Sequence, residues 1–334
     1  MLVFNGSGGG AHVYPKPEVI DLVDETNQCE YFEDDYPYWI IGASGGLVEV
    51  LGRYGGLGCG GRHIFEIESR CFLFFDDATT VIGMSDDRIY TGCISINQTN
   101  LWITGGLSRH PNPDHSPAPY EILSSTEIID AQYKTHTLGP ELPLKLYTHC
   151  MVSISSSEAM IIGGQTGDPD HLIDVLNTYF YNFDTQKWTS GPVLNVKRVY
   201  SGCTLMTALN NEKKIIVTGG FVDSNHPSMT STEILDLNGD RWVYGPELPK
   251  PHHTHAMVSL ADKVYVIAGG GRRSYENDYY NTIYEMDSTL KSWRLLKQRL
   301  IEPRYWPVAA LIPDSATTCT KSKNQENLNN EENP

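Results

Sequence analysis

Four basic side chains recur at one place of a repeating pattern, and they are the residues best suited to recognise a charged partner. They are Arg88, Lys145, Arg198 and Arg304, and each begins a segment that ends in small residues. Guanidinium and ammonium groups donate strong hydrogen bonds to carboxylates and phosphates. In a chain of formal net charge −16, such a cluster would attract an acidic segment. The alternative is that each cation pairs with a carboxylate of the adjacent repeat.

Long polar loops within the repeats, each directly after a glycine doublet, offer a second candidate surface. They cover residues 107–120, 165–174, 221–230 and 271–280. Segments of this length either carry function or are tolerated insertions. The last one holds Arg272, Arg273 and Tyr275, which are residue types enriched in binding hot spots. We expect these three, the four cations and His253 to contact a partner.

Metal and catalytic chemistry find less support in the residues. His252, His253 and His255 stand in one predicted strand, but adjacent strand residues point to opposite faces, so at most two of them converge. The chain has no HExxH, Gly-x-Ser-x-Gly or phosphate-loop motif. Its carboxylate pairs, such as Asp86 and Asp87, are typical of solvated turns. We therefore expect no catalytic residue, metal or cofactor.

Composition and charge narrow the class of protein. The chain has 334 residues, of which 40% are apolar and 10% aromatic, so it can bury a large core. It has no apolar run long enough to cross a membrane. The negative net charge disfavours nucleic acid and acidic membranes as partners. We expect a monomer that binds another protein.

The elements that must position these residues come in six repeats of about 50 residues. Each repeat has a glycine doublet, which in four of them closes a short apolar run rich in β-branched residues. A second strand that ends in Asp, a third strand and a fourth follow the doublet. Four short strands per repeat, without any amphipathic helical window, are typical of a propeller blade. The clearest repeats are marked by Gly105, Gly106, Gly163, Gly164, Gly219, Gly220, Gly269, Gly270, Trp188, Trp242 and Trp293.

Together, the doublet, the strand ending in Asp, the Trp and the Gly-Pro-x-Leu-Pro stretch resemble the kelch repeat. The resemblance covers roughly residues 1–313 and is weakest in the first two repeats, which lack the Trp. It implies an all-β, six-bladed kelch β-propeller with four-stranded antiparallel blades. The last run, residues 305–312, would complete the first blade and close the ring.

The resemblance also carries expectations about function. Kelch-like propellers mostly bind other proteins through loops at one end of the ring, which implies a non-catalytic interaction module. Some kelch-like propellers are copper oxidases or sugar-acid epimerases. An enzyme acting on a sugar or sugar acid at the channel mouth is therefore one alternative, and a secreted structural protein is another. A BTB-like helical domain does not precede the repeats, so a ubiquitin-ligase adaptor of the usual kelch build is not expected.

Five of the seven cysteines fall into two groups. Cys59 and Cys71 lie in neighbouring predicted strands, where a cross-strand disulfide is geometrically feasible. Cys93, Cys150 and Cys203 hold one position in three successive repeats, and we expect them to be small buried hydrophobes.

The compartment is left open by the sequence. Asn5 and Asn97 begin sequons that would be glycosylated only in a secreted chain. The stretch of residues 29–61 is similar to secreted invertebrate kelch-like proteins, in which case Met1 is not the true start; otherwise the chain is expected to be cytoplasmic. Residues 314–334 are polar, and we expect a disordered tail.

Overall fold

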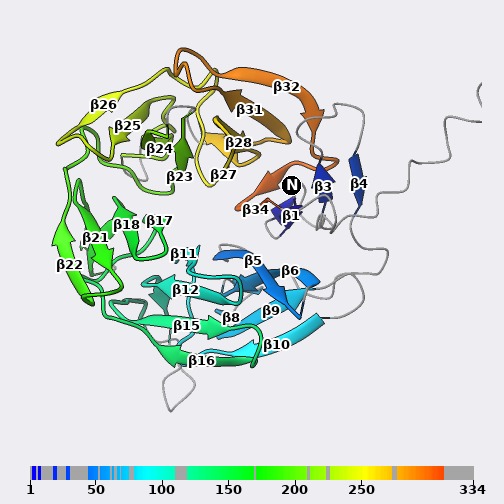
Figure 1. Ribbon diagram of the computed structural model, residues 1–334, viewed down its shortest axis with the longest axis vertical. Coiled ribbons are helices and arrows are strands. Elements are labelled where there is room, and N and C mark those ends of the chain that lie inside the picture. Colours follow the sequence, from blue (N-terminus) through cyan, green and yellow to red (C-terminus); the bar gives the residue numbers. More distant parts are fainter. Residues whose placement is uncertain are drawn as a thin grey trace, which may run out of the picture.

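The computed structural model shows an all-β ring of small antiparallel sheets around a central axis (Figure 1). It describes residues 2–4, 7–8, 18–20, 28–30, 44–51, 53–60, 62–63, 66–67, 69–74, 79–109, 119–168, 171–208, 211–222, 226–272 and 277–311. Within this part of the chain there is no helix, and so none that is long and apolar enough to cross a membrane.

Six sheets have four strands each, written here in the order in which the strands pair. The first sheet has β10 (Thr79–Gly83), β9 (Arg70–Phe74), β6 (Arg53–Cys59) and β5 (Ser44–Val50). The second has β11 (Gly92–Ser95), β12 (Asn100–Thr104), β15 (Thr126–Asp130) and β16 (Thr135–Leu138). The third has β17 (Cys150–Ser155), β18 (Glu158–Ile162), β21 (Thr178–Asn182) and β22 (Lys187–Ser190). The fourth has β23 (Gly202–Thr207), β24 (Lys213–Thr218), β25 (Thr232–Asp236) and β26 (Trp242–Tyr244). The fifth has β27 (Ala256–Leu260), β28 (Lys263–Ile267), β31 (Thr282–Met286) and β32 (Arg294–Arg299). The sixth has β34 (Val308–Ala310), β1 (Leu2–Phe4), β3 (Glu18–Ile20) and β4 (Gln28–Glu30).

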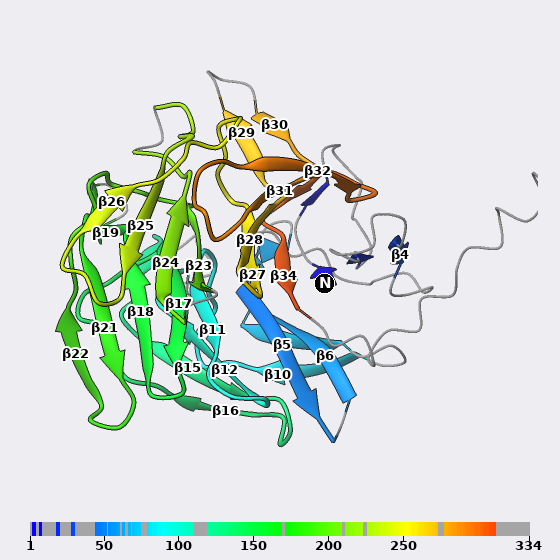
Figure 2. The same cartoon turned by 45° about the horizontal axis from the view of Figure 1, so that its top comes forward.

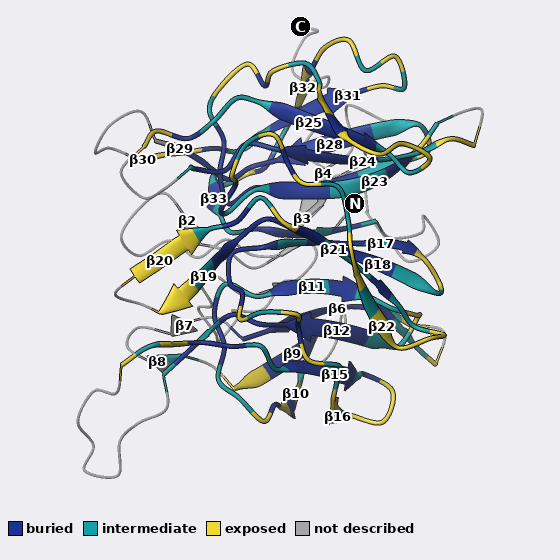
Figure 3. Cartoon of the chain, turned by 90° about the vertical axis from the view of Figure 1, so that its left-hand side faces the viewer, coloured by how far each residue is buried: buried dark blue, intermediate teal, exposed yellow. Residues whose placement is uncertain are grey.

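Five two-stranded sheets extend these blades at the ends of their second strands. They are β2 (Ser7–Gly8) with β33 (Arg304–Tyr305), β7 (Arg62–His63) with β8 (Glu66–Ile67), β13 (Leu107–Ser108) with β14 (Glu121–Ile122), β19 (Gln165–Asp168) with β20 (His171–Asp174), and β29 (Gly270–Arg272) with β30 (Asn277–Tyr279). In Figure 3, β7, β19, β20, β29 and β30 lie on one side of the ring, at the left. We call this end of the propeller the mouth end.

The predicted all-β propeller of four-stranded antiparallel blades is confirmed. The closing strand is also where the sequence placed it, because β34 pairs antiparallel with β1, with Val3 opposite Ala309. Burial is described for five blades; in the sheet of β34, β1, β3 and β4 it is described for β34 alone, so the count of six blades stays a prediction. The predicted tail, residues 314–334, and Asn5 lie outside the described residues.

The hydrophobic core lies between the blades. In β12, Leu101 and Ile103 pack with Leu57 of the preceding blade, whereas Trp102 packs with Ile161 of the following blade. Both faces of the second strand are therefore buried, as the dark blue of β12 in Figure 3 indicates. Figure 2 shows such a second strand, β24, between β23 and β25 of its own sheet. This explains why these strands are continuous apolar runs instead of alternating ones.

Tryptophan side chains link neighbouring blades. Trp242 Nε1 donates to the carbonyl of Pro192 at 2.9 Å, and Trp293 Nε1 donates to the carbonyl of Pro246 at 3.1 Å. The acceptor in each case belongs to the Gly-Pro stretch of the preceding blade. The Trp and the Gly-Pro of the repeat are thus two halves of one inter-blade contact.

One predicted doublet is shifted by a residue. Ala268 and Gly269 have φ of 55° and 83°, which match 58° and 87° at Gly219 and Gly220. The structural counterpart of the doublet in this repeat is therefore Ala268-Gly269, and Gly270 already belongs to β29. The reason is that the left-handed conformation, and not the residue type, defines the position.

The structure has two disulfides among the described cysteines. One joins Cys59 to Cys71 within a blade, and the other joins Cys150 of β17 to Cys203 of β23 across two blades. The expectation that Cys150 and Cys203 are free buried residues is wrong. Cys93 keeps its thiol, packs against the cluster that contains Val48 and Leu57, and has its pKa raised by burial.

The inter-blade disulfide should contribute measurably to stability. Its cysteines are 53 residues apart, and closing a loop of that length stabilises the folded chain by about 4 kcal/mol in the chain-entropy account. We expect the double variant Cys150→Ser/Cys203→Ser to lose most of this free energy of unfolding, measured by urea denaturation of the oxidised protein. The matched control is Cys93→Ser, which should change it by less than about 1 kcal/mol. Equal midpoints for the wild type and the double variant would contradict this role.

Candidate binding site

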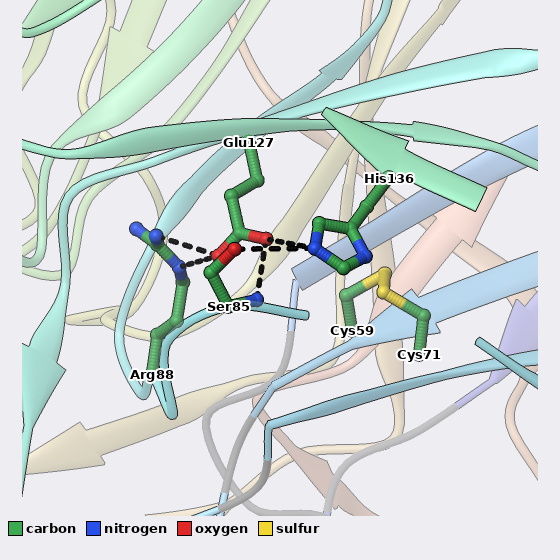
Figure 4. The surroundings of a disulfide bond; sticks show 6 residues. All are labelled: Cys59, Cys71, Ser85, Arg88, Glu127 and His136. Carbon is green, nitrogen blue, oxygen red and sulfur yellow. Dashed lines mark hydrogen bonds and ion pairs between the residues drawn. A yellow bond between two sulfur atoms is a disulfide. The ribbon is translucent and has the colours of Figure 1, made fainter. Parts of the chain in front are cut away.

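The arginines predicted to face a partner are buried instead. Arg88, Arg198 and Arg304 are each 0% exposed. Arg88 Nε and Nη2 donate to Glu127 Oε1 at 3.2 and 2.8 Å (Figure 4). Its Nη1 donates to the carbonyl oxygens of Gly105 and Ser125. The guanidinium therefore has its donors committed inside the protein.

Arg198 repeats the same arrangement two blades further on. Its Nε donates to Glu233 Oε1 at 3.0 Å, and its Nη1 donates to the carbonyls of Gly219 and Ser231 at 2.8 and 3.0 Å. Burial lowers the pKa of Arg198, and the charge of Glu233 opposes this shift. This corrects the hypothesis of a cationic ring around the mouth, because a buried ion pair has no exposed charge to offer an acidic partner.

Lys145 does not share the position of the arginines. The carbonyl oxygens of Leu146 and Arg198 each accept a hydrogen bond from the second glycine of a doublet, at 2.8 and 2.9 Å. Leu146 is thus the counterpart of Arg198, and Lys145 lies one residue earlier. Its side chain is 49% exposed and pairs with Glu121 at 2.7 Å.

His253 is also unsuited to direct contact with a partner. It is 0% exposed, its Nδ1 lies 2.8 Å from Ser228 Oγ, and its Nε2 is hydrogen bonded to the hydroxyl of Tyr305. Its ring packs at a tilt against that of Phe221, with centroids 4.2 Å apart. Arg273, Tyr275 and the side chain of Arg272 lie outside what the structure describes.

Five residues from successive blades form a ring around the axis at the mouth end, which we call the axial ring. They are Tyr90, Thr148, Tyr200, Thr254 and Trp306, with φ between 51° and 61°. Such conformations are uncommon for bulky and β-branched residues and cost about 1–3 kcal/mol each.

Backbone hydrogen bonds join the members of the axial ring. Four of the five backbone N–H groups donate to the carbonyl of the ring residue in the preceding blade: Thr148 to Tyr90, Tyr200 to Thr148, Thr254 to Tyr200 and Trp306 to Thr254, at 2.8–3.2 Å. These bonds run from blade to blade and offset part of the conformational cost.

The axial ring and the residues that follow it line a cavity of about 110 Å³, which we call the mouth cavity. The following residues are Thr91, His149, Ser201, His255 and Pro307. Three aromatic rings meet here: the ring centroids of Tyr90 lie 5.3 Å from those of Tyr200 and of Trp306. No Asp, Glu, Lys or Arg is among the lining residues.

Two histidines of the mouth cavity are held neutral. His149 and His255 are 5% and 7% exposed, and their Nε2 atoms lie 2.7 and 2.8 Å from the hydroxyls of Thr104 and Thr218. Burial lowers the pKa of His149 to about 3, and burial with neighbouring His252 lowers that of His255 well below its usual value.

A glycine in the preceding blade makes room for each of these imidazoles. A Cβ on Gly92 would lie 2.3 Å from His149 Nε2, and a Cβ on Gly202 would lie 2.5 Å from His255 Nε2. The small residue of one blade and the histidine of the next therefore form a matched pair, repeated twice around the axis.

Other predicted sites are placed as follows. Asn97 is exposed in the turn after β11, where its Oδ1 accepts hydrogen bonds from the backbone N–H groups of Thr99 and Asn100. Among the described residues, no group of three or more His, Cys, Asp or Glu side chains could hold a metal ion.

The axial ring was not found from the sequence. A tyrosine follows two residues after each of Arg88, Lys145 and Arg198, so matching by residue type puts Tyr147 beside Tyr90 and Tyr200. The structure puts Thr148 there, because the isolated bridge from Tyr147 to Gln165 corresponds to that from Val199 to Phe221. The signal that was present is the aromatic residue two positions after each buried arginine.

Removing a buried cation should lower the free energy of unfolding far more than removing an exposed one. We expect Arg198→Met to lower the free energy of unfolding by about 3–5 kcal/mol, because Glu233 would be left charged and buried. Lys145→Met, which breaks an exposed pair, is the control and should cost less than about 1 kcal/mol. Urea denaturation measures both, and equal losses would contradict the buried role of Arg198.

Acidification should destabilise the folded protein through its buried histidines. His149, His252 and His255 titrate near pH 6.5 when unfolded, whereas burial holds the folded pKa at about 3 for His149 and about 4 for His252. Below about pH 6.5 the unfolded state binds more protons, so stability falls as pH falls, by about 1.4 kcal/mol per unit for each histidine.

The test compares urea denaturation between about pH 6 and about pH 4 in three proteins. His149→Gln should remove about one histidine's share of the slope. His171→Gln changes a side chain that is 85% exposed and should leave the slope as in the wild type. A His149→Gln slope equal to that of the wild type would show that this imidazole is not buried neutral.

Comparison with known proteins agrees with this geometry. Residues 91–318 match the model of the KLHDC2/KLHL20/DRC7 Kelch-repeats domain. The chain is 20% identical over 212 residues to Kelch repeat-containing protein kel-10 of Caenorhabditis elegans, which covers 56% of this chain and 35% of that protein. It is 29% identical over 127 residues to Kelch-like protein 40 of Mus musculus, which covers 37% of this chain and 20% of that protein.

A plant relative shows the same pattern. The chain is 23% identical over 154 residues to F-box/kelch-repeat protein At1g80440 of Arabidopsis thaliana, which covers 46% of this chain and 41% of that protein. The matched part spans less than half the length of each of these relatives. Because the family model matches well over half of the sequence and the blades have the arrangement it implies, the chain belongs to the kelch-repeat family.

Proposed function

We propose that the chain is a non-catalytic interaction module that holds a segment of a partner protein at the mouth end. Kelch-repeat propellers are typically protein-interaction modules, which supports the class of function. The observation that carries the proposal is the hairpin of β19 and β20, which exposes Leu172 by 44% and Ile173 by 57%. Figure 3 shows this hairpin as exposed and projecting from the ring.

The hairpin stands beside the mouth cavity. Gln165, at its start, pairs with Tyr147, and Tyr147 immediately precedes Thr148 of the axial ring. A segment that packs on Leu172 and Ile173 would therefore lie over the rim of the mouth. Apolar contacts at such a place are where binding energy concentrates.

The chemistry of the described mouth favours a neutral or apolar segment over an acidic one. The acidic preference rested on Arg88, Arg198 and Arg304, and all three are 0% exposed. Lys145, the fourth cation of that hypothesis, is already paired with Glu121. We therefore propose an apolar segment as the ligand of the rim.

A charge placed on the hairpin should abolish binding. We expect peptides selected from a phage-displayed library against the wild-type propeller to lose at least about tenfold in affinity for Ile173→Glu, because a buried unpaired carboxylate is costly. Val243→Glu is the matched control, since Val243 is 50% exposed on the outer strand β26, within a four-stranded blade rather than a mouth hairpin. Calorimetry on wild type and both variants measures the affinities.

Two results would contradict the proposal. If the library yields no peptide that binds the folded propeller, the mouth end is not a peptide-binding surface. If selected peptides bind Ile173→Glu as tightly as the wild type, the rim around β19 and β20 is not the site.

A further inference from the structure

The mouth cavity contains buried polar atoms that the protein itself leaves without partners. Within the described part of the chain, five atoms of its lining residues make no hydrogen bond: Thr148 Oγ1, His149 Nδ1, Ser201 Oγ, His255 Nδ1 and Trp306 Nε1. The side chains of Thr148, His149 and His255 belong to residues that are 5–7% exposed. A buried polar group without a partner costs about 1–3 kcal/mol, so the atoms gathered here call for hydrogen-bonding groups in the cavity, which water or the hydroxyls of a ligand can supply.

These five atoms define what the ligand must offer. The indole nitrogen of Trp306 can only donate a hydrogen bond, whereas the hydroxyls of Thr148 and Ser201 can donate or accept. Each imidazole Nδ1 donates or accepts according to its tautomer, since its Nε2 faces a threonine hydroxyl that can play either part. Hydroxyl groups, which both donate and accept, match this set.

The charge of the cavity excludes ionic ligands. No charged side chain lines it, and burial holds the pKa of His149 at about 3, so both imidazoles are neutral at physiological pH. A phosphate or carboxylate would lose its hydration here without gaining a cation. The arginines two residues before Tyr90 and Tyr200 are committed to Glu127 and Glu233.

The aromatic rings also disfavour a cation and favour an apolar face. Tyr90, Tyr200 and Trp306 contact one another, with ring centroids 5.3–6.1 Å apart. They therefore leave no open aromatic cage that could enclose a quaternary ammonium group. They instead form an aromatic wall on which a face of C–H groups can pack. A ring compound with one C–H face and several hydroxyls fits both the wall and the polar atoms.

We propose that the mouth cavity binds one neutral sugar ring, either as a free monosaccharide or as the terminal residue of a neutral glycan. The volume of about 110 Å³ limits the inserted part to about one ring. This inference does not depend on the rim around Ile173, because its residues lie in the axial ring and directly after it.

The test is isothermal titration calorimetry with named probes. The neutral probes are glucose, galactose, mannose and N-acetylglucosamine, each also as the methyl glycoside and as the terminal unit of a neutral oligosaccharide. Glucuronate and N-acetylneuraminate are the anionic probes, and choline is the cationic probe. We expect at least one neutral probe to bind and the charged probes not to bind; a comparison of free sugar with oligosaccharide identifies the source.

Two variants locate the site. Thr148→Val removes one unpartnered hydroxyl at constant shape, and Trp306→Phe removes the indole donor while an aromatic ring remains. Each should weaken the neutral sugar about 2- to 10-fold, the loss of one hydrogen bond. Thr137→Val, an exposed threonine on the outer strand β16, is the matched control and should bind as the wild type does.

Thermal unfolding without sugar shows whether the variants are folded. It also tests the premise that Thr148 Oγ1 has no hydrogen-bond partner within the protein. Because Thr148 Oγ1 makes no hydrogen bond in the described structure, Thr148→Val should have a melting temperature equal to or above that of the wild type. A clear drop would show that the hydroxyl is satisfied within the protein, which overturns the premise. The proposal is also overturned if no neutral probe binds, if a charged probe binds in preference, or if both variants bind as the wild type does.

Discussion

The propeller depends on one constraint: its described blades share their hydrophobic cores with their neighbours. Leu101 and Trp102 are adjacent in β12, yet one packs against the preceding blade and the other against the following one. Each blade therefore becomes stable only when both neighbours are present, which makes closure of the ring by β34 and β1 an energetic requirement and not a topological detail. The tryptophan of the repeat serves the same end, since Trp242 Nε1 reaches the carbonyl of Pro192 in the blade before it.

The buried arginines follow from this constraint. Arg198 holds the carbonyls of Gly219 and Ser231, so its charge fixes the doublet, with Glu233 as the counter-ion. A buried ion pair of this kind adds little net stability over apolar packing, but it specifies one arrangement of the groups around it. What it specifies is the path of the chain into Tyr200, two residues later, which adopts φ of 57° and joins the axial ring. The arginine is thus a positioning residue for the mouth, although it touches no surface.

Features that repeat by residue type could be predicted from the sequence, and features set by backbone register could not. The strands, the closing strand and the inter-blade tryptophans belong to the first kind. Matching by type aligned Lys145 with Arg88 and Cys150 with Cys203, whereas hydrogen bonding aligns Leu146 with Arg198. A slip of one residue turns a side chain to the other face of its strand. Cys150 therefore faces Cys203 of the next blade and bonds to it, while Cys93 faces the preceding blade as a free thiol.

The lining of the mouth cavity is asymmetric because equivalent positions of successive blades hold different residue types. Blades that were alike would put one residue type all around the axis and produce a symmetric ring with no preferred ligand. Here the aromatic residues Tyr90 and Tyr200 alternate with Thr148 and Thr254. At the next position Thr91 and Ser201 alternate with His149 and His255, whose imidazoles occupy the space left by Gly92 and Gly202. The alternation is tolerated because the backbone hydrogen bonds along the axial ring are independent of side chains and hold the five blades that they join in equivalent places. Specificity in such a propeller is therefore carried by the departures from the repeat, at positions whose geometry the repeat itself guarantees.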